Sequence, residues 1–126
     1  MNSDNKIVMV FLVRNDVKMS KGKIASQVGH ATQYLVEEGL QSKYITYTTW
    51  RKFHNSEKLV LKVNSEKELY ELHSKLIALS KKSHLPIKIV KDPEKTQSDE
   101  NAPTVIGFGP INRNEVSDVI SDLKLL

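Results

Sequence analysis

Cysteine does not occur among the 126 residues of this chain. Disulfide bonds, thiolate nucleophiles and zinc sites built from cysteine are therefore excluded. Long apolar runs are missing too, because no stretch approaches the roughly 20 apolar residues that a helix needs to cross a bilayer. Residues 1–6 show no basic region followed by an apolar stretch, so no signal peptide is expected. These absences favour a cytoplasmic protein that does not insert into membranes.

Several catalytic and nucleotide-binding signatures are also missing. No G-x-S-x-G sequence occurs, which argues against a serine hydrolase. Ser20 and Lys23 match the S-x-x-K pattern of serine β-lactamases, but the Ser-Asp-Asn and Lys-Thr-Gly elements that accompany it are absent. Gly22-Lys23 is not a nucleotide P-loop, because Val17 and Ile24 stand where Gly and Ser or Thr are needed. The four histidines lack metal-ligand spacing such as H-E-x-x-H, so no metal site is expected.

The chain carries a modest excess of positive charge. Nineteen Lys and Arg residues against fifteen Asp and Glu give a formal net charge of +4, which favours an anionic partner. Lys18, Lys21 and Lys23 stand close together. Most surface lysines merely solvate a face, so this cluster becomes informative only if the fold gathers other polar groups beside it.

The hydrophobic pattern predicts four strands, at residues 7–13, 59–63, 87–90 and 104–109. The first is a continuous apolar run, which is typical of a strand covered on both faces. The next two are shorter and rich in β-branched residues. Pro103 stands at the entry of the fourth, and Gly109-Pro110 is expected to end it.

Helical periodicity predicts three clear helices, at residues 21–38, from Ser65 onwards and from about Asn112 onwards. Ser20 is expected to cap the first helix, and Gly39 to end it. Ser65 and Glu68 form a capping box at the start of the second. Residues 44–53 have strand-like composition, but their aromatic residues recur every third position, which favours a short helix.

The alternation of strands and helices predicts one α/β domain over residues 1–126, with helices on both faces of a partly parallel sheet. Residues 1–5 are expected to form a flexible N-terminus. Sites in open α/β sheets form outside the carboxyl ends of parallel strands. If the first and third strands are parallel, the lysine cluster meets the polar loop 92–103 at one edge of the sheet.

One face of the first predicted helix carries polar side chains, at Lys23, Gln27, His30 and Tyr34. The simplest interpretation is an ordinary boundary of an amphipathic helix. The alternative is the wall of a polar pocket, which the neighbouring lysines favour. Exposed amides at a helix start attract anions, and lysines add full charge there. Gly22 would let a bulky anion approach the backbone closely.

Residues 16–31, DVKMSKGKIASQVGHA, closely resemble the motif D-L-x-M-x-K-G-K-x-A-A-Q-x-x-H-A of the type 2 peptidyl-tRNA hydrolases of archaea and eukaryotes. A second region resembles the family's D-A-G-x-T loop and the T-V-x-x-x-G-P segment that follows it. Asp92 and Thr96 match the loop, and Thr104 to Pro110 match the segment. Glu94 stands where glycine is usual. Residues 123–126 are similar to the usual ending of the family.

The resemblance implies a four-stranded mixed sheet flanked by helices, in a three-layer α/β/α arrangement. It implies hydrolysis of the ester between a peptide and the 3′ ribose of tRNA, which recycles tRNA from prematurely released peptidyl-tRNA. The reaction is metal-independent and needs no cofactor, the partner is peptidyl-tRNA, and many members are homodimers. No N-terminal membrane anchor is seen, so no membrane association is expected. The implied catalytic residues are Lys21, Asp92, Thr96 and Thr104, and the implied substrate-binding residues are Lys18, Lys23, Gln27 and His30.

Ester hydrolysis needs an oriented water and positive or donor groups for the developing oxyanion. Neighbouring lysines keep a carboxylate such as Asp92 ionised, which suits orientation of the water better than strong base catalysis. Thr96 would assist it, and either Lys21 or Lys23 would stabilise the oxyanion or hold the terminal phosphate. Gln27 and His30 would position the substrate. The alternative hypothesis is a non-catalytic paralogue that binds RNA or a protein through the lysines.

Overall fold

The structure is a computed structural model that describes residues 5–92 and 102–126. Residues 1–4, within the predicted flexible N-terminus, and residues 93–101, with Thr96 and Glu94, lie outside the described residues. The strands are β1 (Ile7–Arg14), β2 (Lys58–Val63), β3 (Ile87–Lys91), β4 (Pro103–Asn112) and β5 (Lys124–Leu125). They form one sheet in the order β3-β4-β1-β2-β5. The prediction of four strands was therefore wrong by one: β5 has only two residues, too short to leave a periodic signal.

The sheet is mixed, as predicted. Strand β1 pairs parallel to β2 and antiparallel to β4, and β4 pairs antiparallel to β3. Strands β1, β2 and β3 therefore run in the same direction. Their carboxyl ends lie at one edge of the sheet, which brings the segment after β1 to the same edge as the end of β3.

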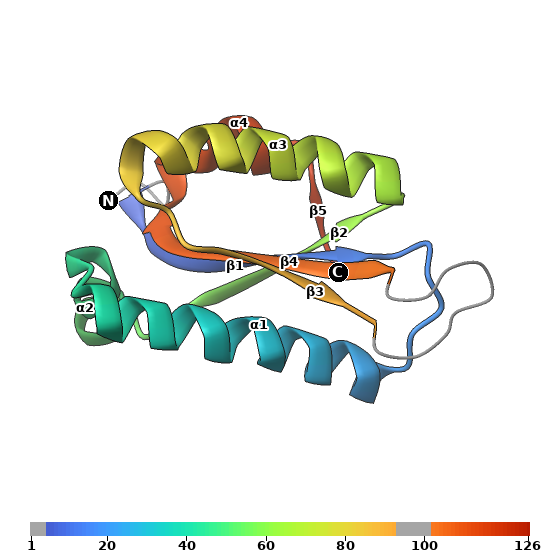
Figure 1. Ribbon diagram of the computed structural model, residues 1–126, viewed down its shortest axis with the longest axis horizontal. Coiled ribbons are helices and arrows are strands. Elements are labelled where there is room, and N and C mark those ends of the chain that lie inside the picture. Colours follow the sequence, from blue (N-terminus) through green and yellow to red (C-terminus); the bar gives the residue numbers. More distant parts are fainter. Residues whose placement is uncertain (1–4, 93–101) are drawn as a thin grey trace.

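Helices cover both faces of the sheet, as expected (Figure 1). The helices are α1 (Lys21–Ser42), α2 (Ile45–Phe53), α3 (Glu66–Ser83) and α4 (Ser117–Ile120), the last preceded by a 3-10 turn at Arg113–Val116. The short helix predicted between the first helix and the second strand is thus confirmed. In place of one longer helix after Asn112, the chain forms the 3-10 turn and the single-turn α4.

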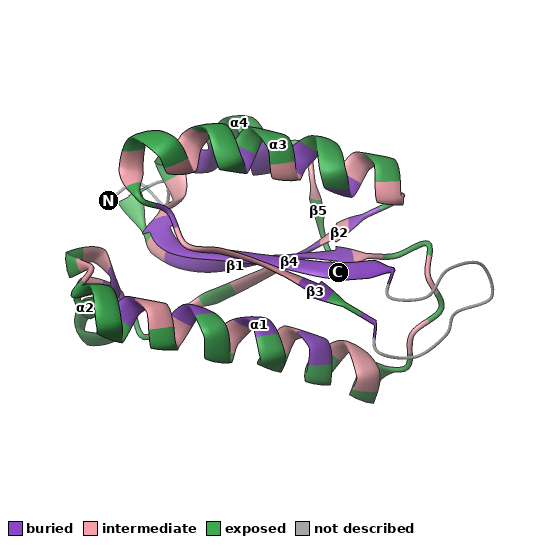
Figure 2. Cartoon of the chain, viewed as in Figure 1, coloured by how far each residue is buried: buried purple, intermediate pink, exposed green. Residues whose placement is uncertain are grey.

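Two apolar clusters, one on each face of the sheet, account for the long apolar run in β1. Val8, Val10 and Leu12 pack towards α3 and α4, whereas Met9, Phe11 and Val13 pack towards α1 and α2. All six side chains are fully buried. Figure 2 shows the same buried character along β1 and β4, between two helical layers whose outer faces are exposed.

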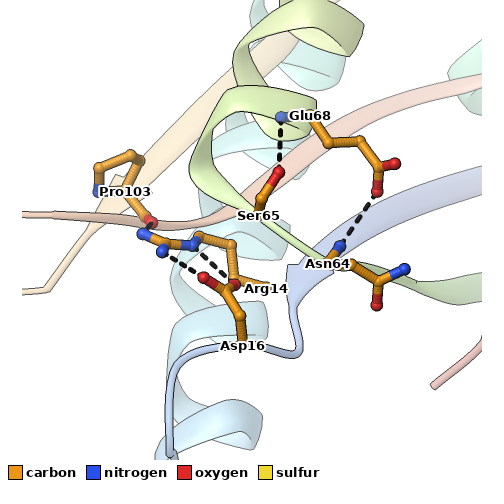
Figure 3. A network of polar contacts seen from close by, with 6 residues as sticks. All are labelled: Arg14, Asp16, Asn64, Ser65, Glu68 and Pro103. Carbon is orange, nitrogen blue, oxygen red and sulfur yellow. Dashed lines mark hydrogen bonds and ion pairs between the residues drawn. The ribbon is translucent and has the colours of Figure 1, made fainter.

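The helix starts follow the predicted caps. Ser20 Oγ accepts a hydrogen bond from the Lys23 amide at 3.1 Å. Ser65 Oγ accepts from the Glu68 amide at 3.0 Å, and the Glu68 carboxylate accepts from the Asn64 amide rather than from that of Ser65 (Figure 3). Both helices therefore begin where the sequence predicts.

Two predicted ends were wrong. Helix α1 continues past Gly39 to Ser42, and Lys43, in the left-handed conformation, follows it. Strand β4 continues through the cis Gly109-Pro110 peptide to Asn112, with Gly109 at φ +103° beside an irregularity in the β1–β4 pairing. Glycine adopts this φ without strain, so here it serves the interior of a strand.

Gly39 serves close packing. A Cβ at this position would lie 2.5 Å from Cδ1 of the buried Tyr47 ring. We expect Gly39→Ala to lower the free energy of unfolding by about 1–3 kcal/mol, since overpacking outweighs the gain in helix propensity. Gly29→Ala is the matched control in the same helix, because a Cβ there meets nothing within 4 Å. It should raise stability by roughly 0.5–1 kcal/mol in urea denaturation. Equal shifts for both variants would contradict this assignment.

Candidate active site

An ion pair joins the start of α1 to the residue after β3. Lys23 Nζ donates to Asp92 Oδ2 at 2.7 Å. The Asp92 side chain is completely buried, whereas that of Lys23 is 29% exposed. A buried carboxylate is therefore held against a cation that still reaches solvent, at the edge where α/β folds form their sites.

A second polar contact lies one helical turn further along α1. Gln27 Nε2 donates to Thr104 Oγ1 at 3.3 Å, and the Thr104 hydroxyl donates to the Val90 carbonyl at 3.3 Å. Gln27 and Thr104 are both buried. The Asp92 amide also donates to the Ala102 carbonyl at 2.9 Å, which links the end of β3 to the start of β4. The structure thus brings Lys23, Gln27, Asp92 and Thr104 together.

Three other predicted site residues, Lys18, Lys21 and His30, are exposed to solvent. Lys18 lies in the segment between β1 and α1, and Lys21 and His30 lie on α1. His30 Nε2 lies 3.5 Å from Ser26 Oγ on the same helix. Within residues 5–92 and 102–126, none of the three is hydrogen-bonded to Asp92 or Thr104. Thr96, the remaining predicted residue, lies outside the described residues.

The start of α1 is suited to an anion. Its first turn contains no acidic residue, so the positive end of the helix dipole is not neutralised from within the helix. A Cβ at Gly22 would meet nothing within 4 Å, which leaves the backbone approachable. Lys21 and Lys23 add full charges to this helix start. A phosphate or a developing oxyanion would be stabilised here.

The polar face of α1 ends at Tyr34. Lys88 of β3 places its ammonium 4.9 Å from the centroid of the Tyr34 ring. Partial desolvation of the phenol, together with the neighbouring Glu38 carboxylate, raises the pKa of Tyr34 above its usual value. Of the four polar residues predicted to share this face, Gln27 is therefore buried, Lys23 is half-buried, and His30 and Tyr34 are exposed.

Two residues that sequence reasoning assigned no role also lie at this edge. Arg14, the last residue of β1, forms a two-pronged ion pair with Asp16 and donates to the Pro103 carbonyl at 3.2 Å (Figure 3). Hydrogen bonding from Arg14 lowers the pKa of the Asp16 carboxyl below its usual value. The signal available in the sequence was an arginine that ends a buried strand, followed two residues later by an aspartate.

Among the described residues, no three His, Asp or Glu side chains gather where they could hold a metal ion. No described helix is both long and apolar enough to span a bilayer.

Comparison with known proteins identifies the family of this chain. The family described as Peptidyl-tRNA hydrolase PTH2 matches residues 7–126. A peptidyl-tRNA hydrolase of Saccharolobus solfataricus is 38% identical over 123 residues, which cover 95% of this chain and 99% of the relative. One from Methanococcus vannielii is 38% identical over 117 residues, covering 91% and 95%, and one from Staphylothermus marinus is 36% identical over 117 residues, covering 93% of each. The chain belongs to the PTH2 family of peptidyl-tRNA hydrolases.

Proposed function

We propose that this chain is an enzyme that hydrolyses the ester joining a peptide, or an N-blocked aminoacyl group, to the 3′ ribose of tRNA. The Lys23–Asp92 ion pair carries this proposal, because it sets a cation and a carboxylate at the anion-attracting start of α1. The activity follows from membership of the family, whose sequence pattern spans nearly the whole chain. The product tRNA is free to be recycled.

The proposed reaction is addition of water to the ester carbonyl. The bond between the carbonyl carbon and the ribose 3′ oxygen breaks, giving a peptide carboxylate, a free 3′ hydroxyl on the tRNA and one proton released to solvent. Negative charge develops on the carbonyl oxygen during the addition, and a positioned cation stabilises it. Lys23 is the better placed of the two candidate lysines for this role, since Asp92 fixes its ammonium at 2.7 Å. Orientation of the attacking water by Asp92, assisted by Thr96, requires the buried carboxylate to become accessible when the substrate binds.

The buried and exposed residues divide the remaining tasks. Thr104 and Gln27 are buried and bonded to each other, so we assign them to holding the wall of α1 against β4. Lys18, Lys21 and His30 are exposed, which suits contact with the phosphates and terminal nucleotides of the substrate. The exposed lysines account for recognition of an anionic substrate without any cofactor or metal.

Three further features belong to this proposal. The whole chain acts as one hydrolase domain. Its location is the cytoplasm, where ribosomes release peptidyl-tRNA.

Assembly into a homodimer is supported by exposed apolar side chains, with Leu40 and Ile45 where α1 leads into α2 and Phe53 at the far end of α2. Sedimentation equilibrium over a range of concentrations tests the dimer.

The test of function is release of the acyl group from N-acetyl-aminoacyl-tRNA by the purified chain. We expect multiple turnovers in the presence of a chelator. A non-catalytic paralogue would bind this tRNA without releasing the acyl group, and that result would overturn the proposal. Because phosphate contacts release counterions, affinity measured at rising salt should fall steeply. For phosphate contacts by Lys18 and Lys21, the log–log slope should be about −1.4 to −1.8.

A further inference from the structure

Arg14 lies where the pairing between β1 and β4 stops. The last Cα partners of these two strands are Val13 and Val105, whereas Arg14 still pairs with Val63 of β2. Beyond that point, the Arg14 side chain continues the connection to β4. Its Nη1 donates to the Pro103 carbonyl at 3.2 Å, across 89 positions of sequence. The Arg14 guanidinium thus connects β1 to β4 beyond the last backbone pair of these two strands.

Asp16 sets the direction of this guanidinium. Its Oδ1 accepts from Arg14 Nε at 3.1 Å and its Oδ2 accepts from Nη2 at 2.6 Å. Two parallel bonds hold the plane of the guanidinium as a single bond could not. The third nitrogen, Nη1, is then aimed at Pro103 (Figure 3). The Arg14 side chain is only 10% exposed, which restricts its other rotamers.

Asp16 and Pro103, two of the partners of Arg14, belong to the two halves of the site. Asp16 lies in the connection that leads into α1. Helix α1 carries Lys21, Lys23 and Gln27. Pro103 immediately precedes Thr104, whose hydroxyl meets Gln27. The guanidinium therefore fixes where α1 begins and where β4 begins, relative to the end of β1.

We propose that Arg14 and Asp16 are positioning residues, which hold the lysine-bearing start of α1 in register with the start of β4. This inference rests on the proposed hydrolase function. The pair acts through Thr104, Gln27 and Lys23 and does not contact the substrate. An alternative role for Arg14 is direct binding of a tRNA phosphate, but its bonds to Asp16 and Pro103 and its burial direct it into the protein.

Arg14→Lys and Asp16→Asn test this proposal. Lysine keeps the charge but loses the planar fork, and asparagine keeps the size but loses the ion pair. We expect Arg14→Lys to lower kcat for N-acetyl-aminoacyl-tRNA about 10- to 100-fold, because misplacement of about 1 Å costs up to roughly 10²-fold. KM and its salt dependence should stay within about threefold of wild type. Asp16→Asn should give a smaller fall in kcat of the same kind. Arg51→Lys, on the exposed face of α2, is the matched control and should match wild type.

A second measurement does not depend on activity. Amide hydrogen exchange should become faster at Thr104 and Val105 in both variants, and stay unchanged at Leu69 and Leu76 of α3.

A raised KM with a flatter salt slope and unchanged kcat would assign Arg14 to phosphate binding and overturn the proposal. Unchanged kcat and exchange in both variants would also overturn it. If Arg14→Lys does not fold, Asp16→Asn decides, since its side chain is 34% exposed. Absence of hydrolysis by wild type would overturn the proposed function, and the exchange data would still test the positioning role.

Discussion

Replacement of Asp92 by asparagine should lower kcat for hydrolysis of N-acetyl-aminoacyl-tRNA by about 10²- to 10⁴-fold. The amide has nearly the same shape as the carboxylate, but it carries no charge. The Lys23 ammonium, now 2.7 Å from Asp92 Oδ2, then loses the anion that fixes it. The attacking water also loses a charged acceptor. Both effects act on the transition state, so KM should change little.

The control for this variant is Asp122→Asn, which removes one negative charge from an exposed position near the C-terminus. It should leave kcat and KM at wild-type values. Thermal unfolding of Asp92→Asn checks that the buried substitution leaves the chain folded at the assay temperature. A folded Asp92→Asn enzyme with kcat within about threefold of wild type would remove Asp92 from the active site.

The fold could be predicted largely because buried strands and amphipathic helices leave strong patterns. The seven apolar residues at the start of β1 reflect coverage on both faces, by the two helical layers. Element ends were harder to predict, because glycine has more than one use. Gly39 provides space for the Tyr47 ring within a helix, and Gly109 adopts a positive φ within a strand. From the sequence alone, neither glycine can be distinguished from one that ends a helix or strand, because the distinction depends on what packs against that glycine.

The sequence was sufficient to predict which two segments of the chain meet at the candidate site. Parallel strand direction places the lysine-bearing start of α1 beside Asp92, and the topology confirms that geometry. The contacts of single residues could not be predicted. Helical spacing places Lys23, and not Lys21, on the polar face of α1, but spacing alone could not show that Lys23 reaches Asp92. The contact of Arg14 with Pro103 was not predictable, because its acceptor is a backbone carbonyl that any residue at position 103 would supply.

Lys23→Met and Lys21→Met should show which lysine stabilises the oxyanion, a role that the sequence left open although the family resemblance names Lys21 as catalytic and Lys23 as substrate-binding. Methionine keeps an unbranched chain and removes the charge. In Lys23→Met, the buried Asp92 carboxylate loses its ion pair with Lys23, so we expect the free energy of unfolding to fall by about 1–3 kcal/mol. Loss of the group that stabilises the oxyanion should also lower kcat by about 10²- to 10³-fold.

Lys21→Met is the matched control, because Lys21 is exposed and makes no ion pair with any residue in the described parts of the chain. Its stability should remain within about 0.5 kcal/mol of wild type, and its effect should appear in KM as weaker binding of an anionic substrate. The double variant Lys23→Met/Asp92→Asn adds a decisive comparison, since the effects of residues in direct contact do not add. If the two groups act as a pair, its kcat should resemble that of the worse single variant. If the fall in kcat of the double variant equals the product of the two single falls, Lys23 and Asp92 act independently. A larger fall in kcat for Lys21→Met than for Lys23→Met would assign the oxyanion role to Lys21.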